Sequence, residues 1–142
     1  MNDEVAAVQR THLRFGWVLL AIFSVLGTAL ELLHAFKIGF FLDVDAEARR
    51  LLWRLAHAHG ALLGLVNIAY AVSVAFVAPA ARGRLALSSR CLLAASVLLP
   101  LGFFLGGSFA SAADPGVSIA LVPVGAVLLI TSLVAMTRHL RT

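Results

Sequence analysis

Long apolar stretches alternate with short charged connections along this chain. Four stretches contain no Asp, Glu, Lys or Arg, at residues 15–30, 55–81, 91–113 and 115–137. A helix that crosses the hydrocarbon core of a bilayer needs about 20 apolar residues, and the first stretch reaches this length only by continuing through Glu31 and His34. The pattern therefore predicts four transmembrane helices, over about residues 15–36, 52–78, 89–110 and 115–137.

The composition agrees with this pattern. Hydrophobic residues make up 61% of the 142 residues and the mean hydropathy is +0.99, which is more apolar side chain than a soluble domain can hide. We expect one domain, residues 1–142, with an all-α fold: an integral membrane four-helix bundle with short loops. A cleaved signal peptide ending near Ala29 is the alternative for the first span, but the apolar pattern continues for two more turns.

Basic residues predict the orientation of the bundle. Seven arginines fall on the side of the two termini, whereas the opposite side carries four basic residues, Lys37, Arg49, Arg50 and Arg54. Short loops rich in Lys and Arg stay cytoplasmic, so we expect both termini inside, in a bacterial inner membrane. The isoelectric point near 10.6 does not indicate nucleic-acid binding, because the arginines are scattered along the membrane edges and suit lipid headgroups instead.

Helical periodicity assigns faces to the first two spans. At about 100° per residue, the small and polar residues of the first span share one face, which we expect to point into the bundle. The second span has an inward face with Gly60, Gly64, Asn67 and Tyr70, and an opposite arc that we expect to face lipid. Residues on that outward arc are Leu62, Leu65, Val72 and Phe76. The third and fourth spans carry no carboxylate or histidine and are expected to act as scaffold.

The candidate site lies near the outer boundary of the membrane. Glu31 and His34 are one turn apart on the first span, so their side chains are neighbours. His57 and His59 enter the second span at a similar depth, but a separation of two residues places them about 160° apart on a helix. We therefore expect at least one of them to act with Glu31 and His34 as one unit, and one of the two to matter much more than the other. Ionisable side chains at membrane depth usually mark a working site.

A transition-metal ion is the first interpretation of this cluster. Glu31-x-x-His34 has the spacing used by metal sites in helical bundles, and His57 and His59 would complete the ligand set. Imidazole and carboxylate ligands suit zinc, iron or manganese. The cluster disfavours a carboxylate-bridged two-iron centre, because such a centre needs several carboxylates and Glu31 is the one carboxylate in the cluster.

A b-type haem is the second interpretation. His34 and either His57 or His59 would supply the axial ligands from two helices, while Lys37 and Arg54 would meet the propionates at the outer edge. Either cofactor predicts a redox or cofactor-handling role.

Two further functions stay open at this point. The chain can be a proton- or cation-coupled transporter or channel subunit that uses Glu31, or a structural or assembly subunit of a homo-oligomer or larger membrane complex. His12 and His139 are expected to be cytoplasmic surface groups.

The basic residues lead to a test of topology. A reporter that is active only in the cytoplasm, fused after Thr142, should be active, and the same reporter inserted between Asp43 and Glu47 should be silent. Activity of a periplasmic reporter at the C-terminus would reverse the orientation and move Glu31 to the inner leaflet.

Overall fold

The computed structural model describes residues 3–43, 46–77, 85–110 and 114–141. In chain order, the helices in these ranges are α1 (Asp3–Ala35), α2 (Gly39–Leu42), α3 (Glu47–Ser73), a 3₁₀ turn (Val74–Phe76), α4 (Leu85–Ser108), a second 3₁₀ turn (Val117–Ala120) and α5 (Leu121–Arg141). Four helical segments are long and apolar enough to cross a membrane: Val5–Ala35, Glu47–Phe76, Leu85–Ser108 and Val117–Leu140. The predicted all-α fold with four helices that are able to span a membrane is confirmed.

The helix α1 begins much earlier than the predicted span at residue 15. Arg10 and Arg14 therefore lie within the helix, and both are exposed. The helix extends before the apolar stretch because the residues there include arginine, which is a good helix former in water. Two of the arginines used to predict topology, Arg82 and Arg84, lie outside the described residues.

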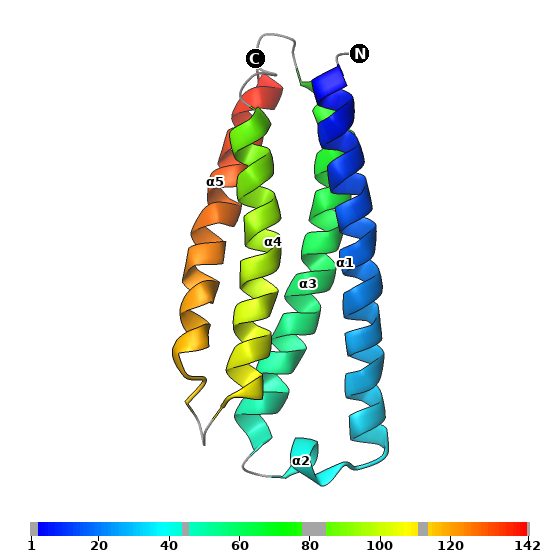
Figure 1. Cartoon of the computed structure of the whole chain (residues 1–142), viewed down its shortest axis with the longest axis vertical. Coiled ribbons are helices and arrows are strands. Elements are labelled where there is room, and N and C mark those ends of the chain that lie inside the picture. The colour runs from blue at the N-terminus through cyan, green and yellow to red at the C-terminus, as the bar shows by residue number, and fades with distance from the viewer. Residues whose placement is uncertain (1–2, 44–45, 78–84, 111–113, 142) are drawn as a thin grey trace.

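The four long helices stand side by side in the order α1, α3, α4 and α5 (Figure 1). Each packs along its neighbour, whereas no extensive contact joins α1 to α5 in the described ranges. In an 18-residue apolar segment of α4, 50% of the residues are buried. The corresponding share is 17% in α1 and in α5. The predicted packing of four helices is confirmed, and its arrangement is an open row rather than a closed ring. Both termini lie at one end, called the termini end below, and α2 lies at the other, the α2 end.

Glycine residues bring α1 and α3 into close contact. A Cβ on Gly16 would lie 2.7 Å from the backbone carbonyl oxygen of Gly64, so the two backbones touch. Along the same seam, a Cβ on Gly60 would overlap a phenylalanine ring of α1, and one on Gly27 would overlap the imidazole of His57. Small residues let helices approach closely in lipid, where packing supplies much of the association energy. Gly60 and Gly64 thus lie on the inward face of α3 that the periodicity predicts, and Gly27 lies on the face of α1 that packs against α3.

The opposite face of α3 is open. The four large residues assigned to its outward arc are each more than half exposed: Leu62, Leu65, Val72 and Phe76. The inward and outward faces of this helix are therefore those that the periodicity predicts.

The apolar core lies at the termini end, where all four long helices contribute to it. Its members include Val5 on α1, Tyr70 on α3, Val74 in the 3₁₀ turn after α3, Leu92 on α4 and Met136 on α5. This cluster joins all four long helices at the termini end.

The α2 end is held by side chains of α3. The Arg49 and Arg50 guanidinium groups donate hydrogen bonds to the carbonyl oxygens of Phe40, at 2.6 Å, and Phe41, at 2.9 Å. Phe41 is fully buried and its ring stacks on Trp53, with centroids 6.2 Å apart. Arg49 and Arg50, two of the basic residues opposite the termini, thus hold α2 to α3.

The backbone contact between Gly16 and Gly64 predicts a matched pair of variants. Gly16→Leu should destabilise the fold by about 1–3 kcal/mol or more, because neither backbone can yield without separating the helices. Ala21→Leu adds a side chain at an exposed position of the same helix and should be close to neutral. Unfolding of the purified proteins in detergent measures the difference. Equal stability of the two variants would contradict this packing of α1 on α3.

Candidate functional site

A polar groove of about 740 Å³ opens between α1 and α3 toward the α2 end. Four of the six residues that the sequence predicts for the site line it, namely Glu31, His34, Arg54 and His57. The remaining lining residues are small or apolar: Ser24, Gly27, Thr28, Leu30 and Ala35. The structure therefore brings one carboxylate, two imidazoles and one guanidinium to a single groove, which is called the outer groove below.

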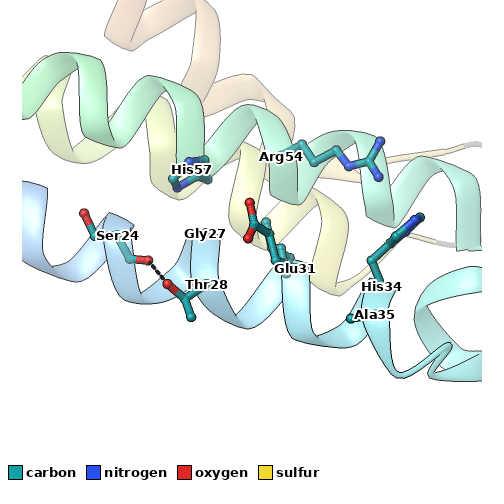
Figure 2. A pocket seen from close by; sticks show the side chains of 9 residues that line it. Ser24, Gly27, Thr28, Glu31, His34, Ala35, Arg54 and His57 are labelled. Carbon is teal, nitrogen blue, oxygen red and sulfur yellow. Dashed lines mark hydrogen bonds between the residues drawn. The ribbon is translucent and has the colours of Figure 1, made fainter.

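Glu31 lies in the middle of this groove. Figure 2 shows its carboxylate projecting from α1 toward α3, with His57 on one side and Arg54 and His34 on the other. Glu31, His34 and Arg54 are exposed. No other described residue forms an ion pair with any of these three. Their polar atoms are consequently open to a ligand.

His57 is held in one orientation. Its Nδ1 lies 2.6 Å from the backbone carbonyl oxygen of Phe23 on α1. A carbonyl oxygen can only accept, so Nδ1 carries the proton and Nε2 of the neutral ring carries a lone pair. The ring rests against Gly27, where a side chain would overlap it. A histidine that binds a metal is typically oriented by such a hydrogen bond from its other nitrogen.

The other two predicted residues do not line the groove. His59 turns toward α4: its Nδ1 bonds the Leu55 carbonyl oxygen of its own helix at 2.8 Å, and its ring lies 4.8 Å from the ring of Phe103. Lys37 sits in the turn after α1 with a positive φ of 51°. His57 and His59 thus point apart, as their two-residue separation predicts.

The donors in the groove do not form a ready-made ion site. No group of three or more His, Cys, Asp or Glu side chains that could hold a metal ion occurs among the described residues. The predicted set of Glu31, His34, His57 and His59 is not assembled, because His59 faces a different helix.

A second polar cluster is buried at the termini end. His12 of α1 is fully enclosed, with 0% exposure. Its Nδ1 lies 2.7 Å from Oδ1 of Asn67 on α3, and its Nε2 lies 2.8 Å from Oγ of Ser89 on α4. The expectation that His12 is a surface group is wrong, because α1 carries it into the contact with α3 and α4. His139 on α5 is also buried, so the same expectation for it is wrong.

The hydrogen-bond partners determine where the protons of this cluster lie. The Asn67 amide nitrogen donates to the Leu63 carbonyl oxygen and to Oγ of Ser96, both at 2.8 Å. Its Oδ1 therefore faces His12 and accepts the Nδ1 proton. The Nε2 atom of the neutral ring then accepts the hydroxyl proton of Ser89. His12 is consequently a neutral imidazole with its proton on Nδ1.

The cluster continues to the fourth spanning helix. The ring of Tyr70 lies 4.4 Å from the ring of His12, and its hydroxyl is 2.7 Å from Oγ of Ser88. Ser132 on α5 donates to the Ser88 carbonyl oxygen at 2.7 Å. Residues of all four long helices thus take part, and α4 and α5 are more than the apolar scaffold expected from their sequence.

A signal for this cluster was present in the sequence. Asn67 and Tyr70 share a face of the second span, and serines recur on one side of the third span at positions 88, 89 and 96. Arg10 and Arg14 flank His12 in the sequence. On a helix, residues two positions away point to the opposite side, so these arginines indicate a buried face at His12.

Comparisons with models of protein families, with curated proteins and with solved structures find no similar protein.

The buried cluster predicts the cost of removing its centre. Asn67→Ala should destabilise the protein by about 1–3 kcal/mol, because the Nδ1 proton of His12 loses its acceptor in a place that water does not reach. Thr131→Ala is the control: Thr131 is exposed and its hydroxyl bonds only its own helix, at Val127, so its loss should cost less than about 0.5 kcal/mol. Detergent unfolding curves measure both values. An Asn67→Ala protein as stable as the control would show that the cluster does not hold the helices together.

Proposed function

We propose that this chain is a small membrane protein that binds a b-type haem in the outer groove, with His57 as an iron ligand, and that it acts in electron transfer or haem handling. The groove faces the outer side of a bacterial inner membrane in this proposal, and both termini face the cytoplasm.

The orientation of His57 is the observation that carries the proposal. The 2.6 Å bond from Nδ1 to the Phe23 carbonyl oxygen leaves Nε2 as the ligating atom. Gly27 leaves room for the ring, so the chain gives this imidazole a defined seat between two helices. When the other ring nitrogen of a ligating histidine donates such a hydrogen bond, the histidine becomes more basic and its ring is fixed in direction.

Two features favour haem over a single metal ion. A protein-bound ion typically needs three or four protein donors, and the described residues do not form such a group. Haem brings four nitrogen ligands of its own and requires only one or two histidines. The groove volume of about 740 Å³ also falls in the range of about 300–1,000 Å³ that is usual for sites of organic ligands.

The remaining groups of the groove have roles in this proposal. Arg54, on the wall opposite Glu31, would bind a haem propionate through charge-assisted hydrogen bonds. His34 would be the second histidine that holds the iron. Glu31 is not needed as a ligand, and it would tune the charge around the iron. Lys37 does not line the groove, and the proposal gives it no role.

The proposal predicts a visible spectrum. The full chain, purified from cells supplied with haem, should show a Soret band at close to one haem per chain. His57→Ala should lower this occupancy at least about tenfold, because it removes the oriented ligand. His59→Ala is the matched control and should retain the haem, since His59 faces α4.

The other candidate functions appear as distinct outcomes. Glu31→Gln should keep the Soret band in a haem protein. Stoichiometric zinc, iron or manganese without a Soret band, and lost in Glu31→Gln, would replace the proposal with a metal-ion site. Absence of both cofactors, with proton or cation flux into proteoliposomes that Glu31→Gln abolishes, would replace it with a transporter.

A further inference from the structure

The neutral His12 ring provides a hydrogen-bonded link between α1 and α4. These two helices are not neighbours in the row and share no extensive contact. In the described part of the chain, the bond between Nε2 of His12 and Oγ of Ser89 is the hydrogen bond that joins them. It exists in this form only while His12 is neutral, because Nε2 acts as the acceptor.

Protonation of His12 would change this link in two ways. A proton on Nε2 would face the hydroxyl proton of Ser89, which must then find another acceptor. One turn before Ser89 on α4 lies the carbonyl oxygen of Leu85. This oxygen already accepts hydrogen bonds from Ser88, at 3.0 Å, and from Tyr70, at 3.4 Å. Protonation would also place a full charge among side chains that cannot compensate it.

Among the described side chains, no carboxylate lies close enough to compensate that charge. Along α1, the acidic residues lie more than two turns from His12, and the described parts of α4 and α5 contain none. The described titratable groups at this level of the molecule are neutral or basic. They are Tyr70 on α3, Arg90 and Cys91 on α4, His139 on α5, and Arg10 and Arg14 on α1.

We propose that His12, Asn67 and Ser89 form a proton-operated latch, which holds α1 against α4 while His12 is neutral and releases α1 when His12 is protonated. Release is favoured because His12 then reaches water or lipid headgroups, which solvate the charged imidazolium far better than the buried cluster does. The latched state is therefore favoured at high pH and loses stability as the pH falls. This proposal does not depend on a haem in the outer groove.

The latch adjoins an apolar groove of about 610 Å³ between α1 and α4. Ser96 connects the groove with the latch, because it lines the groove and accepts a hydrogen bond from Asn67. Phe15 and Leu19 of α1, one and two turns after His12, line the same groove. Movement of α1 away from Ser89 would therefore widen a groove that suits hydrocarbon chains.

The distance between α1 and α4 tests the latch directly. Leu13 and Leu87 are exposed on these helices and accept spin labels as cysteines in a Cys91→Ser background. In lipid nanodiscs, the label distance should increase by about 2 Å or more between pH 8 and pH 5, the scale of helix shifts in switching proteins. His12→Gln can donate to Asn67 and accept from Ser89 without titrating, so its distance should be the same at both pH values.

Controls separate the latch from general effects of pH. His34→Gln removes an exposed histidine of the outer groove and should keep the full pH-dependent shift. Ser89→Ala should show the longer distance already at pH 8. An unchanged distance in the unsubstituted chain, or a shift that persists in His12→Gln, would overturn the proposal.

Discussion

Hydrocarbon offers no hydrogen-bond partner, and this constraint explains how the polar residues of the chain are placed. Two chains of buried polar side chains at the termini end bond from helix to helix, from His12 through Asn67 to Ser96 and from Tyr70 through Ser88 to Ser132. In a membrane, helix packing adds little hydrophobic driving force, so these bonds and the glycine contacts of α1 with α3 position the helices. An open row of four helices is stable because its inner seams combine both kinds of contact.

The outer groove differs from the buried cluster in the same physical terms. Its carboxylate and guanidinium are exposed and form no ion pair with other described residues, whereas its His57 is fixed by a backbone carbonyl. On insertion scales, a charged side chain at the centre of a spanning helix costs about 2.5–3.5 kcal/mol. A ligand or the headgroup region must offset this cost. The polar groups of the buried cluster thus bond to one another within the protein. Those of the outer groove are open to a ligand.

Much of this arrangement can be predicted from the sequence. The charge-free stretches locate the four spans, and the period of 3.6 residues separates Gly60 and Gly64 from Leu62 and Leu65. It also shows that His57 and His59 cannot share a target. Periodicity within α3 cannot tell which of the two histidines faces α1, because that depends on how α1 and α3 are rotated and how they cross. The burial of His12 was missed for a related reason: the flanking arginines define a solvated face, but the partner on the other face comes from residues more than 50 positions away.

The tautomer of His12 tests the account most directly, since it follows from the hydrogen-bond geometry of three helices at once. Nitrogen-15 spectra of histidine side chains in lipid bilayers, assigned by comparison with His12→Gln, distinguish the protonated nitrogen of each ring. At pH 8, we expect a neutral His12 ring with its proton on Nδ1 and a non-protonated Nε2. A ring protonated on Nε2, or an imidazolium at that pH, would contradict the arrangement of α1, α3 and α4 on which the account rests.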